Sequence, residues 1–388
     1  MPIDDTTTPR LDDDPAPAER PTGTGDTPSV DTKTVSDTAE PGDPSLATSM
    51  TATSDQHGVN ASHDTETERE TVRPRRLVRI LAATLTVLFG LFVVWRGLGT
   101  ELAWPFIVVL AYTPYFAACG LLVLAIAMAA RHRLAVVASA AFLVAAAVLI
   151  IPRAIPTGTV TADGPEVTVM SANLGVGNGD VGMVAALVER YDVDILSVQE
   201  LTPEAAEALE ATPELDRLTH RHTITVPDNA AGGGIYSTFP LTDLDQLPGN
   251  FAIPAATVMI DGASPVVFAA IHTASPHRPS QFEPWTFETR ALPSSTSDAP
   301  WILAGDFNAT LDHAALRAVL DRGYRDAASE VGAGLIGTWA PEWFVPPVAL
   351  DHVFVDERIA VTSFDVETVD GSDHSAVIST IRLPADAR

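Results

Sequence analysis

Short apolar runs that end in a polar or charged residue recur along the second half of this chain. The clearest is 301–308, where an apolar strand-like stretch leads into Asp306, Phe307 and Asn308. Buried strands of sheet-containing folds present functional side chains at their carboxyl ends. The recurrence therefore predicts a sheet-based fold with one polar site along a strand edge. Similar endings occur in five other short segments: 167–173, 194–200, 266–272, 350–352 and 372–374.

The polar endings also form a recognisable series, and in chain order they are Asn173, Gln199–Glu200, His272, Gly305–Asp306–Phe307–Asn308, Asp351–His352 and Ser372–Asp373–His374. This series resembles the endonuclease/exonuclease/phosphatase superfamily, which has the DNase I-like fold. The resemblance covers roughly residues 165–384, a little over half of the chain. It implies hydrolysis of phosphoesters with a divalent metal ion.

The pattern of elements in this region also indicates a fold class. Many strands and few helices predict an α+β fold, a two-sheet β-sandwich flanked by helices, and the resemblance implies the same. We expect one helix at 181–191 behind Asp180 as N-cap, and a second that starts at Thr202 and Pro203. Beyond the runs above, strands are expected at 256–260, 351–355 and 376–381.

Charge divides the chain into three parts. Residues 1–72 hold 4 basic against 16 acidic side chains, residues 73–165 hold 8 against 2, and residues 166–388 hold 11 against 32. The first part is rich in Asp, Thr, Pro, Ser and Gly, and this composition predicts a disordered acidic tail over 1–72. The third part contains the expected catalytic domain, 165–384.

The middle part, 73–155, contains three long apolar stretches: Leu77–Trp95, Leu102–Ala130 and Leu134–Ile151. Each is near the ~20 residues that cross a bilayer, so we expect three transmembrane helices. Pro105 and Pro114 are expected to bend the second helix.

Basic residues predict the orientation of this membrane region. Arg73, Arg75 and Arg76 precede the first stretch, and Arg131 and Arg133 separate the second from the third. The positive-inside rule then places the tail in the cytoplasm and, after three crossings, the catalytic domain outside the cell. Arg153, which follows the third stretch, is weak evidence for the opposite orientation. The predicted localisation is a multi-pass protein of the cell membrane.

The single cysteine, Cys119, lies within the second stretch, which excludes an intrachain disulfide and leaves the catalytic domain without a thiol. An exported domain without cysteines is consistent with a bacterial cell surface. The candidate metal ligands of the catalytic domain are carboxylates and amides, which suit Mg²⁺ or Mn²⁺.

Three residues are predicted to bind this ion. Glu200 is expected to be the first metal ligand, and Asp373 is expected to complete the shell. Asn173 is expected either to join Glu200 at the metal or to contact the phosphate. Asp306 is expected to orient or deprotonate the attacking water, and Asn308 to hydrogen-bond a phosphate oxygen.

The predicted catalytic histidines are His272 and His374. His374 is expected to lie near the phosphate, with Asp351 holding its ring in one tautomer. His272 is expected to bind the phosphate or to protonate the leaving group. His352 directly follows Asp351 and therefore points to the opposite face of its strand, which predicts a structural role.

Other motifs in this region have weaker interpretations. His220 and His222 lie in a polar segment that is expected to be solvated rather than to bind a metal. Gly232–Gly234 lack the Lys-Ser/Thr of a P-loop, and Thr238 stands where the resembled family often has a basic residue. Two aromatic motifs either line the site or belong to the core: Thr338–Trp339 and Trp343–Phe344.

These observations predict a membrane-anchored, metal-dependent phosphoesterase that hydrolyses phosphodiester bonds, with nucleic acid as the substrate that the resemblance suggests most often. The charge of the domain opposes nucleic acid, because residues 166–388 contain no lysine and Arg278 and Arg290 are the only basic residues near an expected rim loop. A phospholipid or small phosphoester of the cell envelope is the alternative substrate. A non-catalytic surface binding protein is the alternative class, and the sequence indicates no protein partner.

Overall fold

The computed structural model describes residues 60–158, 160–296, 300–341 and 344–386. Most of the predicted tail lies outside these described residues. Helix α1 spans Asn60–Leu98, so it begins inside the segment 1–72 that was predicted to be disordered.

Three more helices follow before the first strand, namely α2 (Phe106–Ala111), α3 (Thr113–Ala129) and α4 (Arg133–Ile150), with a 3₁₀ turn at Ile151–Ala154. Among the described residues, two helical segments are long and apolar enough to cross a membrane, Arg75–Leu98 and Arg133–Ala154. Their side chains are mostly exposed, as Leu134 (75% exposed) and Val148 (68%) illustrate.

The prediction of one long helix over Leu102–Ala130 is wrong. Residues 102–130 form two helices separated at Tyr112, and α3 has only 17 residues. The prolines explain the difference. Pro105 is the N-cap of α2 and Pro114 lies in the first turn of α3, where the missing N–H of proline costs no hydrogen bond. They start two short helices instead of bending a long one.

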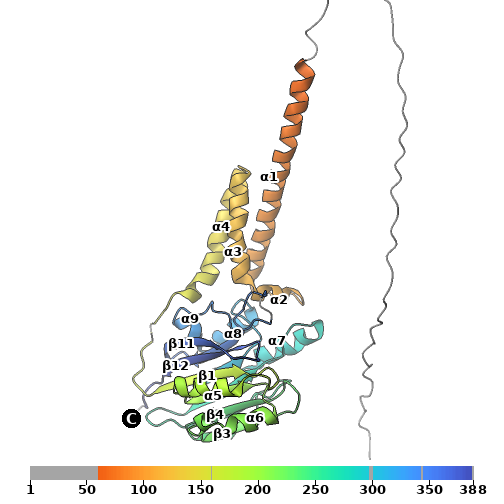
Figure 1. The fold of residues 1–388 in the computed structure, drawn as a ribbon. Coiled ribbons are helices and arrows are strands. Elements are labelled where there is room, and N and C mark those ends of the chain that lie inside the picture. Colours follow the sequence, from red (N-terminus) through yellow and green to blue (C-terminus); the bar gives the residue numbers. More distant parts are fainter. Residues whose placement is uncertain (1–59, 159, 297–299, 342–343, 387–388) are drawn as a thin grey trace, which may run out of the picture. The chain divides into compact units, whose positions relative to one another are not determined.

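The rest of the chain forms two six-stranded sheets (Figure 1). The first sheet has the order β11-β12-β1-β2-β4-β3, with bounds Ala360–Thr368, Ser375–Arg382, Glu166–Asn173, Ile195–Gln199, Gly233–Ser237 and His220–Ile224. The second sheet has the order β5-β6-β7-β8-β10-β9, with bounds Leu241–Leu244, Ala255–Val258, Val266–His272, Trp301–Asp306, Asp351–Asp356 and Tyr324–Asp326. The predicted two-sheet α+β sandwich is confirmed.

Alternation along the strands explains how each sheet has two buried faces. In β8, Ile302 and Ala304 join the core between the sheets, whereas Leu303 packs on the outer side. Helices cover the outer faces: α5 (Val181–Arg190) and α6 (Pro203–Glu210) on the first sheet, α7 (Phe282–Ala291) and α8 (Ala314–Leu320) on the second. Short helices complete the fold: Pro213–Leu215, Pro279–Gln281 and α9 (Ala327–Glu330).

The predicted starts of α5 and α6 are confirmed by their caps. The Asp180 carboxylate accepts hydrogen bonds from the backbone of Gly182 and Met183, and the Thr202 hydroxyl accepts one from Ala205. Both helices follow a parallel strand of the first sheet and thereby fix where that strand ends.

A buried ion-pair cluster joins the helical region to the sandwich. Asp312, 1% exposed, accepts hydrogen bonds from Arg96 Nε at 2.7 Å and from Arg153 Nη2 at 2.7 Å. Burial raises the pKa of Asp312, but the two guanidinium groups outweigh this effect and hold it below its usual value. Since buried charges require partners, Arg96 and Arg153 have a structural reason to be basic.

Candidate active site

The polar side chains that end four strands meet at one edge of the sandwich. In the first sheet β1 and β2 run parallel, with Asn173 paired to Gln199, and in the second sheet β7 and β8 run parallel, with His272 paired to Asp306. The carboxyl ends of both parallel pairs therefore lie together. A hydrogen bond from the Ser197 hydroxyl to the Ala304 carbonyl, at 2.8 Å, links the two sheets beneath this edge.

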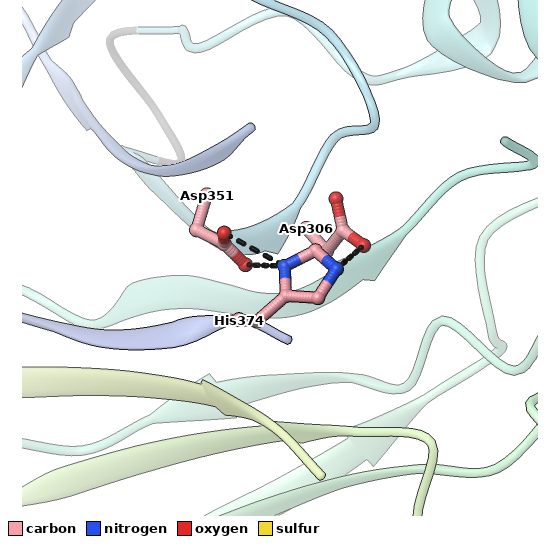
Figure 2. A group of neighbouring side chains, drawn as sticks. All are labelled: Asp306, Asp351 and His374. Atoms are coloured by element: carbon pink, nitrogen blue, oxygen red, sulfur yellow. Dashed lines mark hydrogen bonds and ion pairs between the residues drawn. The ribbon is translucent and has the colours of Figure 1, made fainter. Parts of the chain in front are cut away.

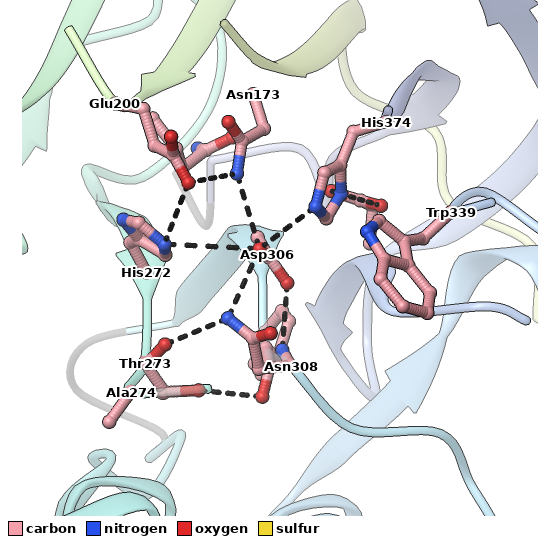
Figure 3. A network of polar contacts seen from close by, with 12 residues as sticks. Asn173, Glu200, His272, Thr273, Ala274, Asp306, Asn308, Trp339 and His374 are labelled. Carbon is pink, nitrogen blue, oxygen red and sulfur yellow. Dashed lines mark hydrogen bonds and ion pairs between the residues drawn. The ribbon is translucent and has the colours of Figure 1, made fainter. Parts of the chain in front are cut away.

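Asp306 lies at the centre of the resulting network (Figure 3). Its Oδ2 accepts hydrogen bonds from the amides of Asn173 and Asn308, both at 3.2 Å, and its Oδ1 accepts one from the Asn308 backbone at 2.8 Å. Burial raises the pKa of this carboxyl, although the charge of His374 opposes the shift. Gly305 lets β7 and β8 approach closely, because a Cβ there would lie 1.9 Å from the Ile271 oxygen.

Glu200 follows β2 and turns back toward the same centre. Its backbone adopts φ 56°, in the left-handed region that is rare for residues with a side chain. Its Oε1 accepts a hydrogen bond from the Asn173 amide at 3.3 Å, and its Oε2 accepts one from the Val176 backbone at 2.7 Å. Burial raises the pKa of Glu200, and Asp373 adds to this effect. A buried carboxylate of this kind favours a cation beside it.

Asp351 and His374 form an oriented pair on the other side of Asp306 (Figure 2). His374 Nδ1 donates to Asp351 Oδ2 at 2.9 Å, and its Nε2 lies 3.6 Å from Asp306 Oδ2. The Thr338 hydroxyl donates to Asp351 Oδ2 at 2.6 Å and fixes this carboxylate. Burial lowers the pKa of His374, but Asp351 and Asp306 outweigh it and raise the value to about 10.

Ligand atoms of Asp306, Asp351 and His374 lie within 4.8 Å of one another, a spacing that would also suit a metal ion. Nδ1 of His374 is already engaged with Asp351, as expected for a histidine held in one tautomer. This contact fixes the orientation of the His374 ring.

His272 ends β7 and stacks on Phe251, with ring centroids 4.4 Å apart. Its Nε2 lies 3.8 Å from Glu200 Oε1 and 3.9 Å from Asp306 Oδ2. Burial and the charge of His374 lower the pKa of His272 to about 3, so the ring is neutral at neutral pH. A neutral imidazole suits hydrogen bonding to a phosphate better than proton donation to a leaving group, and the role of His272 stays a prediction.

Asn308 and Asp373 occupy different depths of the site. The Asn308 amide donates to the Thr273 carbonyl at 2.9 Å as well as to Asp306, which fixes its orientation. Asp373 is exposed, and its Oδ2 accepts a hydrogen bond from Trp339 Nε1 at 2.8 Å. Asp373 thus lies at the rim with Trp339, and its predicted place in the metal shell remains a prediction.

Of the histidines outside this network, His352 points where alternation along its strand predicted, whereas His220 and His222 are only partly exposed and not in the solvated segment that was expected. His352 points away from Asp351, with Nδ1 3.3 Å from Asp326 Oδ1 and Nε2 2.9 Å from the Ala309 carbonyl. His220 and His222 lie in strand β3, and His222 Nδ1 is 3.0 Å from Asp243 Oδ2. Of the aromatic motifs, Trp339 lines the site, Phe344 is exposed, and Trp343 lies outside the described residues.

The site opens into a pocket of about 380 Å³. Its polar lining contains six of the predicted residues: Glu200, His272, Asp306, Asn308, Asp373 and His374. Among the residues that the structure describes, no lysine or arginine lines this pocket. Sequence reasoning did not find Phe251, the contact of Thr338 with Asp351, or the four pocket residues from the α2 region, which are Ile107, Val108, Ala111 and Tyr112.

Comparison with known proteins agrees with this arrangement. The model of the Endonuclease/Exonuclease/phosphatase family matches residues 170–374. A search of curated proteins found no match.

Several solved structures are similar to this chain over 55–56% of its length. An endonuclease/exonuclease/phosphatase from Beutenbergia cavernae is 20% identical, with 72% of its own chain covered and a TM-score of 0.46. D. rerio TDP2 complexed with a single-strand DNA product is 16% identical (99% covered, TM-score 0.45). A mannosyl-6-phosphatase from Bacteroides thetaiotaomicron is 19% identical (99% covered, TM-score 0.42).

Proposed function

The chain belongs to the endonuclease/exonuclease/phosphatase family, and on this basis we propose that it is a metal-dependent phosphoester hydrolase whose reaction takes place at Asp306. The observation that supports this proposal most strongly is the convergence of Glu200 and Asn173 from the first sheet with Asp306 and His374 in one pocket. Buried acids that gather in a pocket without a described lysine or arginine in its lining are typical of a functional site.

The donor set fits a hard divalent cation. Glu200 and Asp306 would hold the ion, since carboxylate oxygens are ligands that Mg²⁺ and Mn²⁺ prefer. Asn173 would position these two carboxylates, because its amide nitrogen donates to both while its oxygen accepts from the Gly175 backbone. The absence of lysine and arginine from the described pocket lining supports this assignment, because an anionic phosphoester would otherwise meet only carboxylates and histidines. When bound, such an ion neutralises phosphoryl oxygens and stabilises the leaving oxygen.

The protein groups have distinct tasks in the hydrolysis. Water attacks phosphorus in line with the ester bond, so that one P–O bond forms as the other breaks. Asp306, whose carboxyl has a raised pKa, orients this water and accepts its proton. His374, protonated at neutral pH and held by Asp351, donates a hydrogen bond to a phosphoryl oxygen, and the amide of Asn308 supplies a second contact.

The test uses the full-length protein in detergent with bis(p-nitrophenyl) phosphate and p-nitrophenyl phosphate as substrates. We expect Mn²⁺-dependent hydrolysis of at least one substrate, lowered ~100-fold or more in Glu200→Gln and Asp306→Asn. Glu204→Gln is the matched control, because Glu204 is exposed on α6 and does not line the pocket. Activity that persists in chelator, or that survives both substitutions, would contradict the proposal.

Binding of the ion can be tested without turnover. A ligand that binds only the folded protein raises its melting temperature. Mn²⁺ is therefore expected to raise the melting temperature of the wild type and of Glu204→Gln, but not of Glu200→Gln. An equal rise in all three proteins would place the ion elsewhere.

We also propose that the enzyme is attached to a membrane through its apolar helices. The exposed leucines and valines of α1 and α4 would be unfavourable in water, and both helices have the length to cross a bilayer. Between them α3, whose 17 residues extend roughly 25 Å, would return the chain through the bilayer.

Contacts at the two ends of these helices support the predicted orientation. Arg79 donates to the Arg131 carbonyl at 3.5 Å, which brings the basic residues near the start of α1 beside the α3–α4 connection. Arg153, which argued for the opposite orientation, is bound to Asp312 and so has a structural role. The positive-inside rule then favours a cytoplasmic N-terminus and an extracellular catalytic domain. Protease treatment of intact cells should release the domain, and its protection while a surface marker is cleaved would reverse the assignment.

Nucleic acid as the substrate stays a prediction without structural support. Its backbone is normally followed by lysine and arginine side chains. Arg278 and Arg290, the predicted rim residues, do not line the pocket.

A further inference from the structure

One wall of the catalytic pocket comes from the region between the apolar helices. Val108 and Ala111 of α2, followed by Tyr112, line the pocket that also contains Glu200 and His374. This wall is far from the catalytic residues in sequence, and it is mainly apolar. A phosphoester in the site would therefore meet carboxylates and histidines on one side and α2 on the other.

The position of α2 is fixed by buried contacts. His313 Nδ1 accepts a hydrogen bond from the Thr310 backbone at 2.9 Å, so its Nε2 carries the proton and donates to the Ile107 carbonyl at 2.8 Å. Ile107 is fully buried in the core of the second sheet's outer face. Trp104 Nε1 donates to the His277 carbonyl at 2.9 Å and holds the chain just before α2.

A second pocket of about 280 Å³ continues this apolar surface toward α3. Ala111 and Val348 line both pockets, so the two are adjacent. Beyond them the lining includes Pro114 and Ala118 of α3 and Leu335, together with the ion pair of Arg153 and Asp312. A partly apolar path thus runs from the acidic residues to the surface of a helix in the region proposed to lie in the membrane.

We propose that α2 and Tyr112 form the recognition wall for the apolar part of an amphiphilic phosphoester, whose phosphate is hydrolysed at Asp306 while its hydrocarbon chain lies along Val108 and Ala111. This inference rests on the proposed function and names its substrate class. Burial of hydrocarbon supplies affinity that needs no charge, which suits a pocket without described lysine or arginine in its lining. Each buried CH₂ group strengthens binding about fourfold.

The experiment compares two substrates with the same scissile bond. Methyl p-nitrophenyl phosphate and octyl p-nitrophenyl phosphate release the same leaving group and differ only in the length of the alkyl chain. The full-length protein in detergent with Mn²⁺ is expected to show a kcat/KM at least about tenfold higher for the octyl ester. Val108→Asn and Ala111→Asn should lower this octyl-to-methyl ratio about fivefold or more.

Val109→Asn is the matched control, because it introduces the same side chain at the next position of α2 and Val109 lines neither pocket. Any effect of detergent on the octyl ester is shared by the variants and cancels in the ratio. An octyl-to-methyl ratio near one in the wild type, or an equal fall of the ratio in Val109→Asn, would overturn the inference and leave the proposed function standing.

Failure of the proposed function has a different signature. In that case neither ester is hydrolysed, or both are hydrolysed equally well by Asp306→Asn. Faster hydrolysis of a single-stranded oligonucleotide than of the octyl ester, undiminished in Val108→Asn, would overturn the inference in favour of nucleic acid.

Discussion

Strand β10 carries two buried carboxylate–histidine pairs on its opposite faces, and they differ in what lies around them. Asp351 binds His374 beside the pocket, whereas the next residue, His352, binds Asp326 on the other face. Both pairs are hidden from solvent, with exposures of 7% or less. In the first pair the other ring nitrogen, His374 Nε2, lies 3.6 Å from Asp306 Oδ2. In the second pair the other ring nitrogen, His352 Nε2, lies 2.9 Å from the Ala309 carbonyl oxygen. Burial and pairing are thus insufficient to mark a catalytic histidine, because the neighbour of the second ring nitrogen makes the difference.

The largest expected effect comes from the pair beside the pocket. His374→Gln keeps a polar side chain next to Asp351 but removes the cation that faces the phosphate. We expect kcat to fall roughly 1,000-fold with a small change in melting temperature. The measurement is hydrolysis of bis(p-nitrophenyl) phosphate by the folded variant. If His374→Gln unfolds the protein and leaves the activity of the folded fraction intact, the two pairs have exchanged their assigned roles.

The second pair is expected to respond in the opposite way. His352→Leu leaves the buried carboxylate of Asp326 without its partner, and breaking a buried ion pair from one side costs about 3 kcal/mol of the free energy of unfolding. Thermal unfolding in detergent should therefore show a melting temperature lowered by several degrees. Activity per folded molecule should stay within about twofold of the wild type, as for other substitutions remote from a site. A loss comparable to that of His374→Gln would contradict the comparison.

A change of pH should separate the charge of the second pair from its packing. Burial lowers the pKa of His352, but Asp326 outweighs it and raises the value above 6.5, so this contribution is lost as pH rises through the folded-state pKa. Burial raises the pKa of Asp326, but His352 and Ser329 outweigh it and lower the value below 3.8, so its contribution is lost as pH falls through that pKa. The pair is most stabilising between the two usual values.

His352→Gln tests this window, since it removes the charge with less change in volume than leucine. The wild type should exceed the variant in melting temperature by more at about pH 5.5 than at about pH 8.5. A difference that is the same at both pH values, or larger at the alkaline one, would mean that His352 is neutral in the folded protein.

The polar site was predictable from the sequence because each of its residues is placed by local rules. Alternation along β10 separates Asp351 from His352, and parallel pairing brings the ends of β7 and β8 together at His272 and Asp306. The sandwich followed from the same strands. These features depend on patterns within each strand and on the pairing of strands that follow one another along the chain.

Features that join distant segments were not predictable in this way. Nothing in the apolar stretch 102–130 distinguishes Ile107, which enters the core of the sandwich, from its neighbours. Arg153 was interpreted as a signal of membrane orientation, although Asp312, the partner that it shares with Arg96, lies more than 150 residues away. Periodicity and composition report on one segment at a time, so a wall assembled from a second segment becomes visible only in three dimensions.

The smallest expected effects concern the hydroxyl groups that support each carboxylate. Thr338 donates to Asp351 Oδ2 and Ser329 donates to Asp326 Oδ2, each at 2.6 Å. Ser329→Ala should lower the free energy of unfolding by about 1 kcal/mol and leave kcat unchanged. Thr338→Val should lower kcat about tenfold in addition to a similar loss of stability, because Asp351 then no longer holds His374 in one orientation. Thr338→Ser keeps the hydroxyl and should retain activity. If Thr338→Val changes stability but leaves kcat unchanged, as Ser329→Ala is expected to do, the orientation of Asp351 does not limit the reaction. The two carboxylate–histidine pairs would then differ only in where they lie.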